Sequence, residues 1–342
     1  MNTKVQGFLK CVIPGKPTTH RNLSIVPLFL KEKGKETYMT LSEGLASGLV
    51  EIEEVSRMGD VNHIKIKNKS KRKLFVADGE EIAGAKQNRV VNHSMLLDGQ
   101  SETVVSASCT EEGRWNYLEE GQKFTDTGHL MARRARQYNA VRLQKNLQKK
   151  DKYAHSQKGV WDDINDYFKK LNTNTQTKAL KDAFDQNSGD LEQFVYNCAP
   201  LDGQCGMAAF INNDLLGIDV LSQPSAYKIL HPKFIKSCAI EALTLPTTKI
   251  PDPTQLQTST FAFIESLLDA TETQHKPVGL GIDYRYLTNH ATASALVYID
   301  EVLHFSAHKN DAKSTALMER KQAENPIDKI VDLFFGNNPF NI

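Results

Sequence analysis

Short apolar runs that alternate with polar residues fill two long stretches of this 342-residue chain, and a helical pattern separates them. Alternation with a period of two predicts half-buried strands, whereas a long run without Gly or Pro predicts a helix. The sequence therefore predicts an α+β protein. We divide it into a strand-rich part (1–125), a helical insertion or cap (126–197), a second α/β part packed on the first (198–310) and a polar tail (311–342).

Local signals predict where several helices begin and end. Thr40 and Glu43 form a capping box that begins a short helix, and Gly48 can end that helix in a left-handed conformation. The candidate N-caps at 125–127 precede a run, 129–151, that contains neither Gly nor Pro and predicts one long helix.

Four arginines lie on this long helix, and they have two interpretations. Their guanidinium groups could hold phosphate or an acidic partner, or they could form the solvated face of an exposed helix. We adopt the solvated face, because such charge patterns are routine on surface helices. The four are Arg133, Arg134, Arg136 and Arg142.

The second α/β part repeats the alternation of elements. Residues 207–221 predict a hairpin with a turn at INND, and 225–243 predict a helix that Pro232 interrupts. Residues 278–308 predict a final set of strands.

Composition narrows the classes of partner and location. Lysine plus arginine (42) exceed aspartate plus glutamate (41) by one, so no global charge favours nucleic acid or an anionic membrane. No apolar run approaches the roughly 20 residues of a membrane span, and the start makes a poor signal peptide. The five cysteines are odd in number and irregularly spaced, which favours reduced thiols and a cytoplasmic location. The oligomeric state stays open.

The segment 78–115 carries an unusual density of reactive side chains between strand-like runs. Such links usually consist of simple turn residues, so this density predicts a site for a polar ligand. The catalytic candidates are Glu80, Glu81, Glu111 and Cys109, and the ligand-binding candidates are Gln87, Asn88, Arg89, Arg114 and Trp115.

Each residue type in this segment suits a particular task. The forks of Arg89 and Arg114 suit phosphate, and neighbouring amides suit ribose hydroxyls or a base edge. A glutamate whose pKa is raised by burial can act as general acid or base. Alternatively, the arginines and glutamates form an internal ion-pair network. Cys109 is either a nucleophile activated by a nearby arginine or a buried structural thiol, which we favour, and Trp115 either stacks on a ring or packs in the core.

Two further candidates lie in the final strands. Asp283 and Arg285 share one face of a strand. His304 and His308 have a spacing that suits a metal on a helix, but their surroundings predict a strand, so we predict no metal site. Arg285 and His304 join the ligand-binding candidates. The familiar phosphate-loop, zinc-protease, serine-hydrolase and dinucleotide motifs are absent from the sequence, and we expect no cofactor.

Three segments together resemble a known bacterial family. The runs YMTLSEGLASGLVEIEE, GEEIAGAKQNRVVNHSMLL and SCTEEGRW resemble the ARG and rhodanese-phosphatase-superfamily-associated protein domain, in which ARG stands for ADP-ribosylglycohydrolase. The resemblance extends over roughly residues 20 to 310. It implies an α+β domain linked to ADP-ribose and NAD metabolism.

Three functional hypotheses follow. The first is a protein that binds or processes an ADP-ribose-type nucleotide, with hydrolysis as the expected reaction if it is an enzyme. In this hypothesis Arg89 and Arg114 hold phosphate, and Glu80 or Glu81 supplies acid–base chemistry. The second is a non-catalytic nucleotide sensor that signals through the basic helix. The third is an interaction protein in which the polar clusters are only structural.

Overall fold

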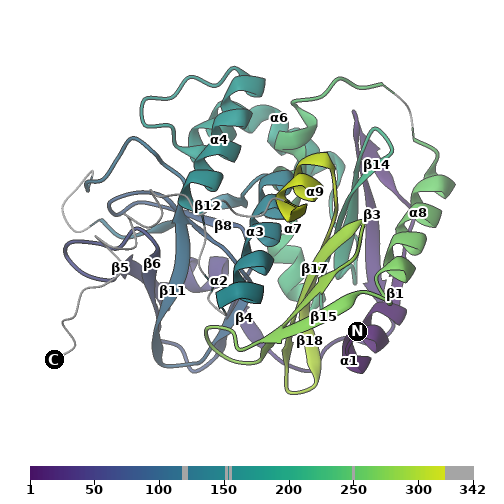
Figure 1. Ribbon diagram of the computed structural model, residues 1–342, viewed down its shortest axis with the longest axis horizontal. Helices are drawn as coiled ribbons and strands as arrows, with labels where there is room; N and C mark the ends of the chain where they lie inside the picture. The colour runs from purple at the N-terminus through teal and green to yellow at the C-terminus, as the bar shows by residue number, and fades with distance from the viewer. Residues whose placement is uncertain (118–121, 151–152, 154–155, 249–250, 320–342) are drawn as a thin grey trace.

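The largest sheet takes strands from both ends of the chain (Figure 1). The computed structural model describes residues 1–117, 122–150, 153, 156–248 and 251–319. The sheet runs β1-β3-β13-β14-β18-β17-β16-β15, with β2 also paired to β3, and every pairing in it is antiparallel. Its strands are β1 (Val12–Pro14), β2 (Thr18–His20), β3 (Leu23–Leu30), β13 (Gly206–Ile211), β14 (Asp214–Leu221), β15 (Thr271–His275), β16 (Ile282–Leu287), β17 (Ala291–Tyr298) and β18 (Glu301–Lys309).

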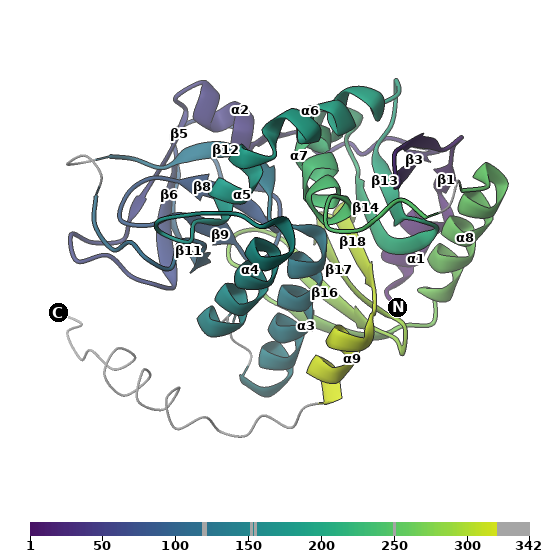
Figure 2. The ribbon, with the colours of Figure 1, turned by 90° about the horizontal axis from the view of Figure 1, so that it is seen from above.

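Both faces of this nine-stranded sheet are covered, because successive side chains on a strand point to opposite faces. On β13, Met207 and Ala209 join one apolar cluster, and Ala208 and Phe210 join another. The second cluster lies under α1 (Thr3–Lys10) and α8 (Pro253–Ser266), whereas the first lies under α7 (Pro224–Ala242). Figure 2 shows α1 and α8 on the outer side of the sheet and α7 on its inner side.

Two smaller sheets lie beyond the inner face. One has six strands in the order β12-β8-β9-β11-β6-β5, and the other has three in the order β10-β7-β4, in which β4 and β7 run parallel. A backbone bridge between Leu96 and Leu280 ties the three-stranded sheet to the segment before β16. The strands are β4 (Tyr38–Thr40), β5 (Val50–Glu54), β6 (His63–Asn68), β7 (Lys73–Val76), β8 (Glu80–Ala83), β9 (Arg89–Val91), β10 (Met95–Leu97), β11 (Ser101–Cys109) and β12 (Thr125–Leu130).

The remaining helices are α2 (Leu41–Ala46), α3 (Arg133–Lys150), α4 (Gln157–Leu171), α5 (Leu180–Gln186), α6 (Ser188–Asn197) and α9 (Ala312–Glu319). The predicted α+β class and the predicted capping box are confirmed: Thr40 Oγ1 accepts from the Glu43 backbone, and the Glu43 carboxylate accepts from the Thr40 backbone. Of the predicted polar tail, residues 320–342 lie outside the described residues.

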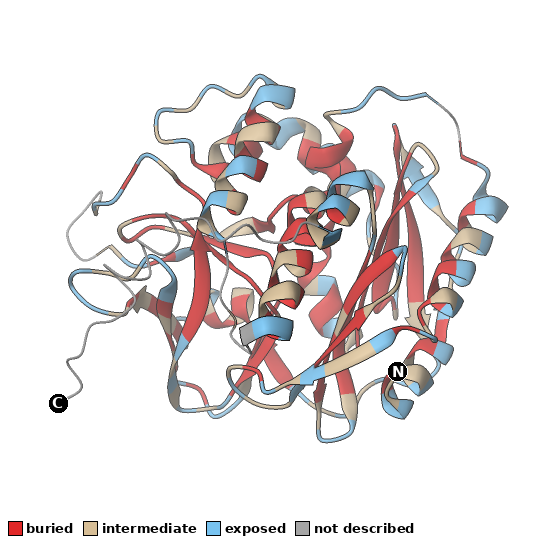
Figure 3. Ribbon diagram, in the orientation of Figure 1, coloured by how far each residue is buried: buried red, intermediate tan, exposed pale blue. Residues whose placement is uncertain are grey.

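Two predictions about helices are wrong: the start of the long helix and the interruption at Pro232. Residues 125–127 are not N-caps but the start of β12, which pairs with β8, so the long helix begins only at Arg133. Pro232 does not interrupt its helix, because α7 continues through it from Pro224 to Ala242. Most of α7 is buried between the sheets (Figure 3), and this packing outweighs the one hydrogen bond that proline cannot donate.

Among the described residues, none of the helices combines the length and the apolar composition that a membrane crossing requires.

Gly217 has a backbone conformation that the inner face of the sheet requires. Its φ is +143°, and a Cβ there would collide with the Ala307 backbone oxygen and the Arg133 guanidinium. We expect Gly217→Ala to lower the free energy of unfolding by about 1–3 kcal/mol, the usual cost of a strained backbone position. Gly7→Ala is the matched control: it lies in α1 with open space around it and should stabilise the protein by about 0.5–1 kcal/mol. Urea unfolding of both variants tests this, and equal effects would contradict it.

Candidate functional site

The residues predicted in segment 78–115 lie inside the protein, with one exception. Trp115 is 43% exposed, and each of the others is at most 6% exposed. The strands β8, β9 and β11 place them between the six-stranded sheet and the helices that pack on it. The predicted site side chains other than Trp115 therefore lie in the interior and not on a surface loop.

Arg114 is fully occupied by protein groups. Its Nη2 and Nε donate to the two oxygens of Glu111 at 2.6 and 2.9 Å, and its Nη1 donates to the backbone oxygens of Ala85 (2.7 Å) and Asn116 (2.9 Å). The Asn88 backbone N–H also donates to Glu111 at 3.2 Å. This bidentate pair fixes the loop between β8 and β9.

Arg89 is equally enclosed. Its Nη1 donates to Gln87 Oε1 at 3.0 Å and to Cys109 Sγ at 2.6 Å, and its Nη2 lies 3.6 Å from a Glu54 oxygen. Burial raises the pKa of Cys109 to about 12 despite the nearby arginine, so this cysteine is a protonated thiol at neutral pH. The Arg89 guanidinium also lies 5.3 Å from the centre of the Trp115 ring.

Glu80 and Glu81 point into two different networks. Glu80 accepts from Lys233 Nζ on α7 at 2.7 Å and from the Ala77 backbone at 2.8 Å, and Lys233 also pairs with Asp126 at 2.8 Å. This network ties α7 to β8 and β12.

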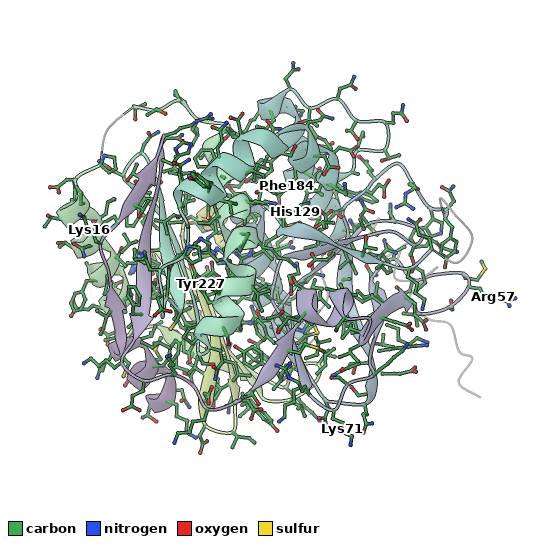
Figure 4. The ribbon with its side chains drawn as sticks, turned by 180° about the vertical axis from the view of Figure 1, so that it is seen from behind. Lys16, Arg57, Lys71, His129, Phe184 and Tyr227 are labelled. Carbon is green, nitrogen blue, oxygen red and sulfur yellow. The ribbon has the colours of Figure 1, made fainter. Side chains whose placement is uncertain are left out.

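Glu81 lies in a buried cluster with the imidazole of His129. It accepts from Thr110 Oγ1, and His129 Nε2 is 3.2 Å from its other oxygen without the alignment of a hydrogen bond. The His129 ring stacks in parallel on Phe184, with ring centres 3.7 Å apart; Figure 4 labels both residues. Burial raises the pKa of Glu81 to about 8 and lowers the pKa of His129 to about 3, so both side chains are uncharged at neutral pH.

The structure thus brings one predicted group together and leaves the glutamates of β8 apart from it. Near one another lie Gln87, Asn88, Arg89, Cys109, Glu111 and Arg114. Most of the polar atoms in this group bind each other or the backbone, as the ion-pair interpretation of the sequence expects.

A second polar group lies on the inner face of the nine-stranded sheet. Asp219, Ser306, Ser294 and Arg285 are paired in register across β14, β18, β17 and β16. They form a polar stripe across the inner face, whereas their neighbours along each strand point into the outer apolar cluster. Arg285 is held by Asp283, whose Oδ2 accepts from its Nε (2.9 Å) and Nη2 (2.8 Å).

Two arginines of α3 meet this stripe. Arg136 Nη2 donates to Asp78 Oδ1 and to Asp219 Oδ1, both at 3.0 Å, and Arg133 donates to the other oxygen of Asp219. The interpretation of these arginines as a solvated face is wrong, because Arg133 and Arg136 are 1% and 2% exposed. Although burial opposes ionisation, the two guanidiniums hold the pKa of Asp219 well below its usual value.

His304 completes this group, which we call the central cluster: Asp78, Ser94, Arg133, Arg136, Asp219 and His304. His304 Nδ1 lies 2.8 Å from Ser94 Oγ, and its Nε2 lies 3.5 Å from Asp219 Oδ1. The rings of Phe75 and Phe234 flank it, with centres 5.8 and 6.3 Å away. His304 and Arg285, predicted as ligand-binding residues, therefore lie on the same face of the sheet.

A small polar cavity, which we call the central cavity, adjoins the central cluster. Its free volume is ≈ 10 Å³, room for about one water molecule. Asn92 Oδ1 accepts from Ser108 Oγ (3.0 Å) and Asn139 Nδ2 (3.3 Å), which leaves the buried Asn92 Nδ2 without an acceptor. The lining comprises Asp78, Gly79, Val91, Asn92, His93, Met131, Arg136, Asn139, Ala140, Arg285, Ser294 and His308.

The central cluster has a spacing that would also suit a cation, but its charge is already balanced. One atom each of Asp78, Asp219 and His304 fall within 4.8 Å of one another. Arg133 and Arg136 supply two positive charges to the two carboxylates, so a divalent ion would leave a surplus of positive charge in a buried place. We interpret the group as an aspartate–arginine network, and the sequence prediction of no metal site stays a prediction.

Sequence reasoning named His304 as a ligand-binding residue but missed most of this group. Asp78, Asn92 and Ser94 lie within segment 78–115 but were not among the predicted site residues, whereas Asp219 stands in an ordinary strand pattern. Arg133 and Arg136 did carry a signal: arginines three apart share one face of a helix, and that face was assigned to solvent instead of to an acidic partner.

The Glu81 carboxyl predicts a pH dependence of stability. In the unfolded chain it ionises near 4.5, but in the folded protein near 8, so between these values only the unfolded state loses the proton and stability falls as pH rises. His129 has the opposite effect on stability, but only below pH 6.5, and the comparison with Glu81→Gln cancels the contributions of other groups. We expect the free energy of unfolding of wild type to fall by about 1.4 kcal/mol per pH unit relative to Glu81→Gln between pH 6.5 and 8.

Urea unfolding at four pH values between 6.5 and 8 measures this difference. Glu112→Gln is the control, since Glu112 forms an exposed ion pair with Lys178 and should leave the slope unchanged. A constant difference between wild type and Glu81→Gln would show that Glu81 is ionised in the folded protein.

Comparison with known families agrees with the resemblance seen in the sequence. The model of the ARG and Rhodanese-Phosphatase-superfamily-associated Protein domain matches residues 12–308. Comparisons with curated proteins and with solved structures give no match. The matched range begins at β1, ends on β18 and includes both the central cluster and segment 78–115. The chain therefore belongs to the ARG and rhodanese-phosphatase-superfamily-associated protein domain family.

Proposed function

We propose that this protein binds a nucleotide of the ADP-ribose or NAD-derived class and receives a phosphate of that nucleotide in the central cavity. The observation that carries the proposal is the set of donors at the cavity: two guanidiniums, of Arg136 and Arg285, and the buried Asn92 Nδ2, which has no acceptor. A buried donor without a partner is costly, and an anionic oxygen would satisfy it. The family name supports the nucleotide class, since ARG denotes ADP-ribosylglycohydrolase.

The cavity is smaller than a phosphate, so binding requires movement at its edge. Asp78 is the group best placed to move, because its side chain lines the cavity and is 16% exposed. An incoming phosphate would compete with the Asp78 carboxylate for Arg136, whose guanidinium would remain paired with Asp219. A phosphate thus replaces one anion by another and keeps the local charge balanced.

The sequence prediction placed phosphate on Arg89 and Arg114 instead, and one observation favours a second candidate site there. Trp115 is 43% exposed, and Arg89 and Lys86 lie 5.3 and 5.7 Å from its ring centre. A base could stack on this ring while the cations attract phosphate. The donors of Arg114, however, are already bound to Glu111 and to backbone oxygens.

The acid–base role of Glu80 or Glu81 has less support than the binding role. Both carboxyl groups are fully buried, and neither is among the residues that line the central cavity. A non-catalytic nucleotide sensor remains the alternative function. Overnight incubation with ADP-ribose or NAD, followed by mass analysis, separates the two: new product masses exclude a pure sensor, and unchanged ligand with saturable binding supports it.

Two arginine-to-lysine variants decide between the two binding sites. Lysine keeps the charge but loses the fork that binds an anion in two places. If phosphate lies in the central cavity, Arg285→Lys should weaken ADP-ribose binding about 10-fold or more, the worth of one charged hydrogen bond. Arg89→Lys, at an equally buried position, should then bind as wild type does.

Thermal unfolding against ADP-ribose, NAD and AMP is the first measurement. A ligand at about 100 times its Kd stabilises the folded state by about 2.7 kcal/mol, which is readily seen as a higher Tm. Isothermal titration of both variants then gives the ratio of Kd values. Loss of binding in Arg89→Lys alone would move the site to Trp115, and no stabilisation by any of the three nucleotides would overturn the proposal.

A further inference from the structure

Ser94, His304 and Asp219 lie next to one another at the contact between the layers, with a hydrogen bond between Ser94 and His304 and a longer ion-pair contact between His304 and Asp219. Ser94 lies between β9 and β10, whereas His304 and Asp219 lie on the neighbouring strands β18 and β14. Ser94 Oγ is 2.8 Å from His304 Nδ1, and His304 Nε2 is 3.5 Å from Asp219 Oδ1. A hydroxyl, an imidazole and a carboxylate in this order are the parts of an activated nucleophile.

The surroundings of Ser94 direct its proton toward the imidazole. Ser94 Oγ accepts from the Asp78 backbone N–H at 3.0 Å, which occupies one lone pair. Its own proton then points to His304 Nδ1 at 2.8 Å or to the more distant Asp78 Oδ1 at 3.3 Å. The shorter contact makes Nδ1 the acceptor, and Nε2 then carries the proton of the neutral ring.

The carboxylates are placed to stabilise the imidazolium that forms when His304 takes a proton. Nε2 lies 3.5 Å from Oδ1 of Asp219, which two arginines keep ionised, and Nδ1 lies 3.9 Å from Asp78. Phe75 and Phe234 hold the ring, which is 2% exposed. The base is therefore fixed in position before any substrate binds.

We propose that Ser94 is a nucleophile, with His304 as its general base, that cleaves a carboxylic ester carried on a phosphate-bearing molecule. Asp219 is a positioning residue for His304. The phosphate part of this substrate rests on the proposed function, since the central cavity would hold it, but the nucleophile does not.

The reaction balances without any further reagent than water. Ser94 Oγ forms a bond to the ester carbonyl carbon while its proton passes to His304 Nδ1. The carbon–oxygen bond to the alcohol then breaks, and His304 returns the proton to the departing alkoxide. Water attacks the acyl group on Ser94 and gives a proton to His304, which passes it to the Ser94 oxygen as the carboxylic acid leaves.

Covalent labelling with diisopropyl fluorophosphate tests the nucleophile directly. We expect wild type to gain one phosphoryl adduct on the peptide that contains Ser94, and Ser94→Ala to gain none there. Ser42→Ala is the matched control. Ser42 is also partly buried, but it donates to the Asp126 carboxylate at 2.7 Å and not to an imidazole. Ser42→Ala should be labelled on Ser94 like wild type.

His304→Gln tests the base, provided that its thermal unfolding shows a folded protein. Loss of a general base should slow labelling about 100-fold or more. No adduct on Ser94 in wild type overturns the proposal, and so does a folded His304→Gln that is labelled at the wild-type rate. If His304→Gln does not fold, the comparison of Ser94→Ala with wild type still decides.

A competition experiment separates this proposal from the proposed function. Labelling of Ser94 that ADP-ribose slows supports both. Labelling that ADP-ribose leaves unchanged supports the nucleophile and counts against the nucleotide site, whereas binding of ADP-ribose without any labelling overturns the nucleophile alone.

Discussion

The guanidinium of Arg136 joins the two layers of the protein. It bridges Asp78, in the link between β7 and β8, and Asp219, on β14 of the nine-stranded sheet. Gly79 makes this approach possible: its φ is +82°, and a Cβ at this position would collide with the Arg136 side chain. This contact, together with that of Arg133 to Asp219, holds α3 against the sheet and borders the central cavity.

Such a bridge contributes little net stability, but it constrains the relative positions of the residues that it joins. The free energy lost when two carboxylates and two guanidiniums leave water offsets much of the free energy gained from their attraction. Apolar groups of the same shape often stabilise a fold equally well. A charged network, however, is satisfied in few arrangements, so it fixes distances that apolar packing leaves free. Here it fixes His304 relative to Ser94 across two separate sheets.

Sequence patterns were sufficient where a structure depends on neighbours along the chain. The capping box at Thr40, the hairpin of β13 and β14 and the strand around His304 and His308 follow from local signals, and all are present. Such local patterns could not predict which charged residues pair with one another. Arg136 and Asp219 are 83 residues apart, and nothing local distinguishes an arginine that faces solvent from one that faces a buried aspartate.

The candidate site shows the same division. Segment 78–115 was recognised from its composition, and its residues form several buried polar networks, but composition does not reveal whether such networks bind a ligand or only one another. The central cluster takes a residue or two from each of five segments. The register of the strands aligns Asp219 with Ser306, Ser294 and Arg285. The packing of α3 and of the links that carry Asp78 and Ser94 against this face brings the rest of the cluster together.

The inclusion of both chain ends in one sheet has a consequence for biosynthesis. Ser94 and His304 are separated by 210 residues, so a ribosome adding about 5–20 residues per second needs about 10–40 s to produce the second after the first. The apolar strand β3 emerges long before its partner β13 and is exposed to other chains until residues 206–211 have been synthesised. Nascent chains of this protein are therefore vulnerable to aggregation, and the serine meets its imidazole only after residue 304 has been synthesised.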